Sequence, residues 1–267
     1  MTVYFVTGKL GQGKSVTSVG QIKTYLNQGR RVATNLDLYP ENFANKYNKN
    51  TDITRLPDKP TSENLKQLGW GYYGEKIQEN MNGLIVLDEC GTWFNSRTWN
   101  DKDRKDLIDW FLHARKFRWD IIFIVQDISI VDKQARQTLC EHLVVCRRLD
   151  RLQIPLVSRF FKLFGLNVRF PRMFLGKVHY GDNEQALVSD RWTHRGSDLF
   201  SMYDTEQAFT DRNDGLHCVL TPWHLVGRYK PRLTFRKVAK RSLMFLLYYL
   251  VINPYQVITG RPILVTR

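Results

Sequence analysis

The chain has 267 residues, 43% of them hydrophobic, which suffices for one substantial α/β domain plus an extension. Twelve of its fourteen excess positive charges lie in two short segments, 147–172 and 230–241, whereas a nucleic-acid-binding domain usually spreads its basic charge over a face. The four cysteines lack C-x-x-C spacing, which argues against a zinc site and favours reduced thiols.

The first predicted elements are a strand over 2–7, a phosphate-binding loop and a helix over 16–26. The loop has the spacing G-x-x-x-x-G-K-S, in which backbone N–H groups and a helix N-terminus face phosphate oxygens. Lys14 is then placed to reach the β- and γ-phosphates of ATP, and the Ser15 hydroxyl to bind Mg²⁺. The alternative is a glycine-rich turn that only connects a strand to a helix. The predicted nucleotide-binding residues are Gly8, Lys9, Leu10, Gly11, Gln12, Gly13, Lys14, Ser15 and Val16.

A second strand is predicted over 31–38, and segment 42–66, rich in Asn, Lys, Asp and Pro, predicts a surface excursion. The apolar run 83–87 is typical of a strand covered on both faces of a parallel sheet. Asp88 follows it and is placed to bind Mg²⁺, while Glu89 can polarise the attacking water as a general base. The alternative is an ordinary strand followed by a solvated acidic turn.

Helices over 103–116 and 129–141 alternate with strands over 120–126 and 143–146. This alternation predicts an α/β fold, a P-loop NTPase with a mostly parallel sheet flanked by helices. Ligands of such sheets bind at the carboxyl ends of the strands, where the loop, Asp88 and Gln126 would converge. Gln126 is predicted to position the water near the γ-phosphate, and a simple strand cap is the alternative.

Segment 147–175 is a basic and aromatic extension of the domain, in which large apolar side chains alternate with cations. Its composition fits contact with the anionic inner leaflet of a membrane. It fits equally a grip on single-stranded DNA through base stacking and phosphate contacts. A core helix or hairpin that packs on the sheet is the third interpretation.

The C-terminal part begins with the basic segment 230–241, which precedes the uncharged segment 242–260. By the positive-inside rule, the basic segment and the domain 1–229 stay in the cytoplasm. We therefore predict a single transmembrane helix over 242–260, kinked near Pro254, and a short periplasmic end over 261–267. A buried or interfacial helix is the alternative. No signal peptide is expected, because the first strand is needed for the phosphate loop.

Ten runs of the sequence carry a resemblance to a known family. They are Met1–Ser15, Ala33–Asp37, Gly83–Phe94, Asp109–Arg115, Trp119–Asp127, Ile130–Arg136, Cys146–Asp150, His179–Asp182, Tyr203–Thr205 and Leu220–Pro222. Together they resemble the assembly protein of filamentous phages, the inovirus morphogenesis ATPase, which is similar to the N-terminal domain of the zonula occludens toxin (Zot) family. The most specific match is Leu87–Arg97, which overlaps the third run, since the loop and the acidic pair are shared by many NTPases.

The resemblance implies a host inner-membrane protein whose cytoplasmic ATPase domain drives extrusion of coated single-stranded phage DNA. The implied partners are phage coat proteins, the DNA, inner-membrane lipids and other phage assembly proteins, including an outer-membrane channel. A member of the family would be expected to continue past the membrane span into a periplasmic tail.

P-loop motors of this type usually form homo-oligomeric rings in which a neighbouring subunit supplies an arginine to the γ-phosphate. Arg115, Arg136 and Arg147 are the candidates, and Arg136 is the one predicted. Two other function classes stay open at this point. One is a soluble P-loop kinase of a small molecule, which would need an arginine-rich lid, and the other is a Zot-like secreted effector.

Overall fold

The computed structural model describes residues 1–49, 51–76, 78–92, 102–150, 172–210, 214–229, 234–248 and 250. The chain divides into two compact units, Met1–Arg228 and Tyr229–Arg267. Most of the predicted basic and aromatic extension, 151–171, lies outside the described residues, as do 251–267 and the run 93–97 of the most specific match.

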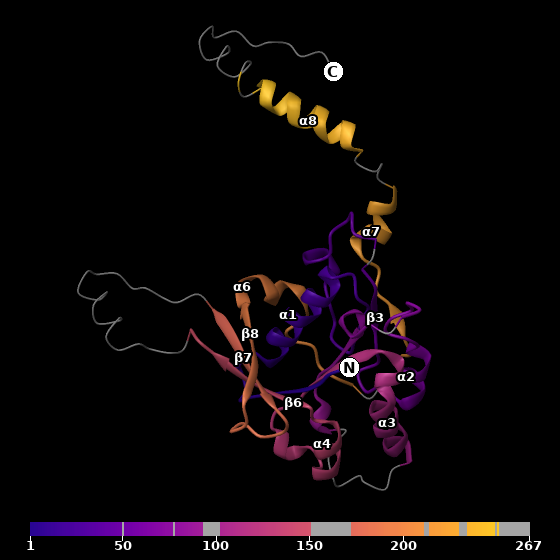
Figure 1. Cartoon of the computed structure of the whole chain (residues 1–267), viewed down its shortest axis with the longest axis vertical. Coiled ribbons are helices and arrows are strands. Elements are labelled where there is room, and N and C mark those ends of the chain that lie inside the picture. Colours follow the sequence, from indigo (N-terminus) through magenta and orange to yellow (C-terminus); the bar gives the residue numbers. More distant parts are fainter. Residues whose placement is uncertain are drawn as a thin grey trace, which may run out of the picture. The chain divides into compact units, whose positions relative to one another are not determined.

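A single sheet forms the centre of the first unit (Figure 1). The described strands run in the order β8-β7-β6-β1-β5-β4-β2-β3-β9. The six strands from β6 to β3 are mutually parallel, while β7, β8 and β9 pair in the antiparallel sense. The predicted mostly parallel sheet is therefore confirmed. The strands are β1 (Val3–Thr7), β2 (Val32–Thr34), β3 (Ile53–Arg55), β4 (Gly83–Leu87), β5 (Trp119–Ile124), β6 (His142–Arg148), β7 (Met173–Tyr180), β8 (Val188–Arg195) and β9 (His217–Cys218).

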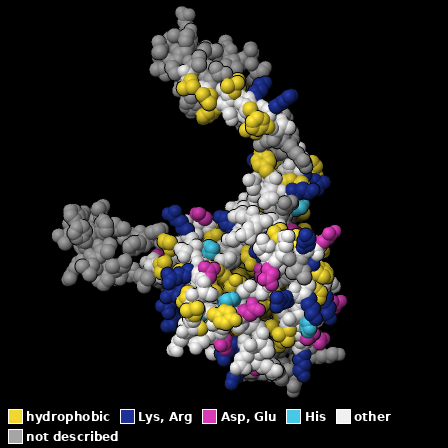
Figure 2. Space-filling view, in the orientation of Figure 1, with side chains coloured by type: hydrophobic (Ala, Val, Ile, Leu, Met, Phe, Trp, Pro, Cys, Tyr) yellow, Lys and Arg dark blue, Asp and Glu magenta, His cyan; other side chains and the backbone are white. Residues whose placement is uncertain are grey.

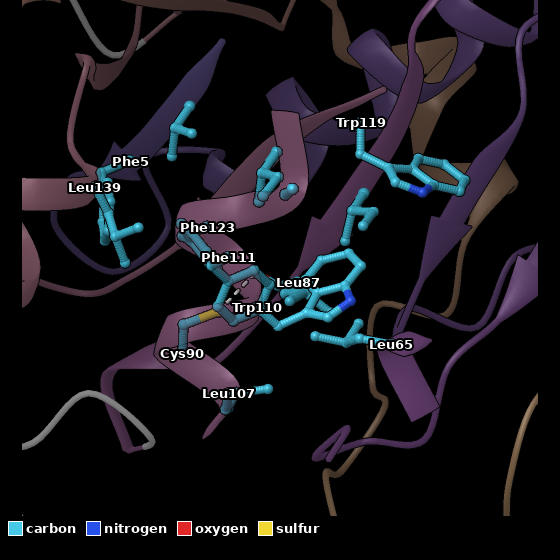
Figure 3. Close-up of a cluster of buried hydrophobic side chains, with 14 of the residues drawn as sticks. Phe5, Leu65, Leu87, Cys90, Leu107, Trp110, Phe111, Trp119, Phe123 and Leu139 are labelled. Carbon is cyan, nitrogen blue, oxygen red and sulfur yellow. Dashed lines mark hydrogen bonds between the residues drawn. The ribbon is translucent and has the colours of Figure 1, made fainter. Parts of the chain in front are cut away.

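Helices cover both faces of this sheet, as the alternating pattern predicts. On one face, α1 packs its apolar stripe, which includes Val19 and Ile22, onto β1, β4 and β5. On the other face, the cluster of buried side chains combines residues of α2, α3 and α4 with the strands (Figure 3). The described helices are α1 (Lys14–Asn27), α2 (Ser62–Leu68), α3 (Lys102–His113), α4 (Lys133–Leu139), α6 (Gly196–Leu199), α7 (Pro222–Leu225) and α8 (Phe235–Leu247).

The surface excursion predicted over 42–66 is wrong for its second half. This part of the chain contains β3 and most of α2, and the side chains of Ile53, Leu56 and Leu65 are fully buried. Their apolar residues are too widely spaced to form a recognisable run among Asn, Lys and Asp. The helix predicted over 129–141 is also shorter, because a 3₁₀ turn over Ile128–Ile130 precedes α4.

The second unit contains α8, on which large apolar side chains are exposed toward its C-terminal end. Figure 2 shows these side chains beside Lys and Arg on the same helix. Among the described residues, we find no helix with the length and apolar character needed to cross a membrane.

Candidate functional site

The phosphate loop connects the carboxyl end of β1 to the first turn of α1. Gly8 and Gly13 have positive φ angles of 145° and 87°, in the region that only glycine adopts without strain. The tip of the loop, including Leu10, is exposed, and Val16 is buried on α1. The loop is also tied to β6, since the Gln12 Oε1 accepts a 2.9 Å hydrogen bond from the backbone N–H of Arg148.

Gly13 lies directly against the ring of Phe174, a buried side chain of β7. An ideal Cβ on Gly13 would be 2.0 Å from the Phe174 Cδ1 atom, far inside the van der Waals contact distance. Two properties of this position therefore require glycine, the positive φ angle and the absence of a side chain. The antiparallel strand β7 thus contacts the phosphate loop through Phe174, and the sequence does not predict this contact.

Replacing Gly13 by Ala is expected to destabilise the fold by about 2–4 kcal/mol, from the left-handed backbone and the clash together. Gly181→Ala is the matched control, because Gly181 has a φ of 78° but nothing within 4 Å of its ideal Cβ. It should lose only the backbone contribution, about 1–2 kcal/mol. Denaturant unfolding of both variants measures the difference, and equal losses would contradict the packing of Phe174 under the loop.

The side chains of the loop lysine and serine each make one hydrogen bond at the loop. The Lys14 Nζ donates a 2.9 Å hydrogen bond to the backbone carbonyl of Gly8 across the loop. The Ser15 Oγ donates a 2.8 Å hydrogen bond to Oδ2 of Asp88, 73 residues away in sequence. The hydroxyl and the carboxylate predicted to bind Mg²⁺ are therefore neighbours.

Asp88 and Glu89 form the acidic turn after β4. Burial raises the pKa of the Asp88 carboxyl above its ordinary value, although the hydrogen bonds from Ser15 and from the Glu89 N–H lower it. Glu89 is exposed and has a φ of 56°, one of two positive values among the described non-glycine residues. A strained backbone of this kind is found preferentially at functional sites.

Because the folded protein holds the Asp88 proton more tightly than the unfolded chain, the ionised carboxylate costs folding free energy above its raised pKa. That cost disappears as the pH falls below about 3.9, the ordinary Asp value. Asp88→Asn should therefore raise the Tm at about pH 7.5 without Mg²⁺, and the gain should shrink toward about pH 4. Thermal unfolding across this pH range measures the gain in Tm. A lower Tm of the variant at neutral pH would contradict the raised pKa of Asp88.

Gln126 follows β5 and lies at the same edge of the sheet, with an exposed side chain. Its backbone carbonyl accepts a 3.3 Å hydrogen bond from Thr7 Oγ1, so the ends of β1 and β5 are joined directly before the loop. The structure thus brings the loop, Asp88, Glu89 and Gln126 to one edge. The role of the Gln126 side chain stays a prediction.

None of the three candidate arginines pairs its side chain with a residue of the phosphate loop. Arg136 forms an ion pair with Asp182 at 3.1 Å, which joins α4 to the turn after β7. Arg115 is 3.5 Å from Glu79, and Arg147 is an exposed residue of β6. A contribution of Arg136 to a neighbouring subunit's site stays a prediction.

One residue of the site was not predicted, Asn35, which follows β2 and has no exposed surface. Its Oδ1 accepts a 2.8 Å hydrogen bond from the Asp88 N–H, and its Nδ2 donates to the Asp88 carbonyl at 3.1 Å. A polar side chain at the end of an apolar strand is the sequence signal that could have indicated it.

The sequence model of the zonular occludens toxin (Zot) family matches residues 2–164. The chain belongs to the zonular occludens toxin family. It is 48% identical over 250 residues to the gene 1 protein of Enterobacteria phage M13, and this match covers 92% of the chain and 71% of that protein. The gene 1 protein of Salmonella phage IKe is 46% identical over 260 residues, with the same two coverages.

Among solved structures, the N-terminal domain of zonular occludens toxin from Neisseria meningitidis is similar, with a TM-score of 0.41 and 18% identity over 76% of this chain and 98% of that one. The relatives match the chain well beyond the end of the family model, so the resemblance expected over most of the chain is confirmed. In this Zot-family chain, residues outside that model reach the site, since Phe174 lies under Gly13.

Proposed function

We propose that this protein is the membrane-anchored ATPase that powers assembly and extrusion of filamentous phage through the host inner membrane. The observation that carries the proposal is the hydrogen bond between Ser15 of the loop and Asp88, with Glu89 next to it. The family and the 48% identity to phage gene 1 protein supply the biological role.

The site fits ATP. Its glycines leave room for backbone N–H groups to approach phosphate oxygens. Gly8 also has no room for a side chain, because an ideal Cβ there would be 2.9 Å from the Cys146 carbonyl oxygen. Lys14 would exchange its bond to the Gly8 carbonyl for the charged phosphate oxygens, which are stronger partners. Exposed Glu89 can orient a water and accept its proton, the step that distinguishes hydrolysis from transfer to a small molecule.

The site also fits Mg²⁺. Mg²⁺ is usually bound in proteins through one or two carboxylates or hydroxyls together with substrate phosphates and water. Ser15 and Asp88 are the residues that would hold it, and they already lie 2.8 Å apart. When bound, the ion neutralises charge that develops on the phosphate oxygens.

We place the first unit in the cytoplasm and the C-terminal segment in the inner membrane. What supports this is the basic segment 230–241 followed by exposed Leu243, Met244 and Phe245 on α8. The partners that follow from this role are further copies of the chain in a ring, phage coat proteins, single-stranded phage DNA and an outer-membrane channel. Fusions of a periplasm-dependent reporter enzyme after residue 229 and after residue 267 test the placement, and activity of the first fusion would contradict it.

Phage release tests the role. When Lys14→Ala replaces the only copy of this gene in a phage genome, the titre of released particles should fall about 100-fold or more, because a phosphate-binding charge is lost. Viral DNA should still accumulate in the cells, since replication does not need export. Lys66→Ala removes the same charge from an exposed position of α2, on the face of the sheet opposite α1, so this control should release particles normally. An undiminished titre of Lys14→Ala would contradict the role.

A further inference from the structure

Asn35 lies where the parallel ladder between β2 and β4 ends. The last paired residues are Thr34 and Val86, and the chain of β4 continues into Asp88. Both backbone polar groups of Asp88 then bond to one side chain, with the N–H donating to Asn35 Oδ1 and the carbonyl accepting from Asn35 Nδ2. The amide of Asn35 thus replaces the missing strand neighbour of Asp88 and fixes its backbone.

The position of the Asp88 carboxylate depends on that backbone. Its Oδ1 accepts a 2.7 Å hydrogen bond from the Glu89 N–H, and its Oδ2 accepts the bond from Ser15. Glu89 leaves the strand in the left-handed region, a conformation that persists only where its surroundings hold it. A rigid Asp88 backbone therefore holds the Asp88 carboxylate against the Ser15 hydroxyl. It also holds the Glu89 backbone in the left-handed conformation that turns the chain away from β4.

Asn35 is held in turn by a segment far along the chain. The other hydrogen of the Asn35 Nδ2 is donated to the Asp58 carbonyl, at 2.9 Å. The backbone carbonyl of Asn35 accepts a 2.8 Å hydrogen bond from Gln207 Nε2, 172 residues further along the chain. Gln207 Oε1 also accepts from the Asp37 N–H at 2.8 Å. Both Nδ2 hydrogens and the side-chain oxygen of Asn35 are satisfied, so the amide has one orientation.

The segment that carries Gln207 is built onto the end of β2. The Tyr39 N–H donates to the Met202 carbonyl, and the Asp204 N–H donates to the Asp37 carbonyl, both at 2.8 Å. Tyr203 between them is buried, and burial together with the nearby Asp88 carboxylate raises its pKa to about 12. A segment outside the family model therefore holds the end of β2, from which Asn35 bonds to the acidic turn.

We propose that Asn35 is the positioning residue of the Asp88–Glu89 pair, and that Gln207 holds Asn35 in the orientation this requires. The proposal rests on the proposed ATP hydrolysis, because it assigns a role to the turn that would hold Mg²⁺ and orient the water. Asn35 would contact neither the Mg²⁺ nor the water, and it acts only through the backbone of Asp88.

Asn35→Asp tests the positioning role with almost no change of shape. The variant places an oxygen where Nδ2 donates, so it faces the carbonyls of Asp88 and Asp58 without hydrogens to offer. We expect kcat for ATP to fall about 10- to 100-fold, as for other residues that orient metal-binding groups. We also expect the Mg²⁺ concentration for half-maximal rate to rise, with binding of metal-free ATP unchanged. Hydrogen exchange of the Asp88 and Glu89 amides should become faster.

Asn82→Ala is the matched control. Asn82 is also buried, and its Nδ2 donates to Asp120 Oδ1, but it precedes β4 at the opposite end of that strand. It should lower stability without changing the Mg²⁺ dependence or the exchange of the acidic turn. Gln207→Ala is the milder variant if Asn35→Asp does not fold, and it should change the same quantities in the same direction.

The proposal is overturned if the Asn35 and Gln207 variants match Asn82→Ala in Mg²⁺ dependence, or if exchange at Asp88 and Glu89 equals that of the wild type. A wild-type chain that does not hydrolyse ATP would instead overturn the proposed function. In that case exchange of the acidic turn alone decides whether Asn35 positions it.

Discussion

Replacing Glu89 by Gln is expected to lower ATP hydrolysis by about 10²- to 10⁴-fold, the usual contribution of a general base. The amide keeps the size of the side chain and the exposed position at the turn, but it cannot accept the proton of the attacking water. Binding of ATP should stay within about twofold, because Lys14 and the loop glycines make the phosphate contacts. Phosphate release and binding of a fluorescent ATP analogue separate the two effects.

Glu75→Gln is the control for the loss of one negative charge. Glu75 is exposed like Glu89, but it lies in the chain between α2 and β4, before the strand rather than after it. Its variant should hydrolyse ATP at the wild-type rate. If Glu89→Gln keeps more than about half of the wild-type rate, then Glu89 is not the base, since such residues rarely contribute so little.

Trp119→Ala is expected to destabilise the first unit by about 3–5 kcal/mol, the range for removing a large buried aromatic side chain. Trp119 begins β5 and has no exposed surface, and its Nε1 donates a 2.9 Å hydrogen bond to the Gly69 carbonyl. Gly83 of the neighbouring strand lies so close that an ideal Cβ there would be 2.4 Å from the indole ring. The loss is a large part of the total stability of a typical domain.

Denaturant unfolding of Trp119→Ala and Trp70→Ala measures this effect. Trp70 is 44% exposed and serves as the matched control, for which we expect a loss of about 1 kcal/mol or less. A loss below about 1 kcal/mol for Trp119→Ala would contradict the packing described for the amino end of β5.

The parts of the fold that the sequence predicts are those with local signals. β4 and β5 appear as uninterrupted apolar runs because both of their faces are covered, and each of their residues is buried in the structure. The acidic pair follows β4 directly, and the loop follows the mostly buried run of β1, so their meeting at the carboxyl edge of the sheet could be derived. The hydrogen bond between Ser15 and Asp88 agrees with that derivation.

The features that the sequence does not predict depend on contacts between distant segments. The Asn35 side chain is explained only when β2 lies beside β4, 53 residues away, and its carbonyl partner Gln207 is 172 residues away. Likewise, nothing near Gly13 indicates that Phe174 will lie against it. β3 was missed because Ile53 is buried within a polar stretch of the chain, so that burial rather than pattern defines it.

ATP hydrolysis is tested most directly by the rate of Mg²⁺-dependent phosphate release from ATP. The 267-residue chain is purified in detergent or supplied with inner-membrane lipid. The wild type and Lys14→Ala are measured side by side at equal concentration. We predict turnover by the wild type that is abolished by chelation of Mg²⁺ and reduced about 100-fold or more in the variant. Equal rates in the two proteins, or no binding and no hydrolysis of ATP by the oligomeric wild type, would contradict the account.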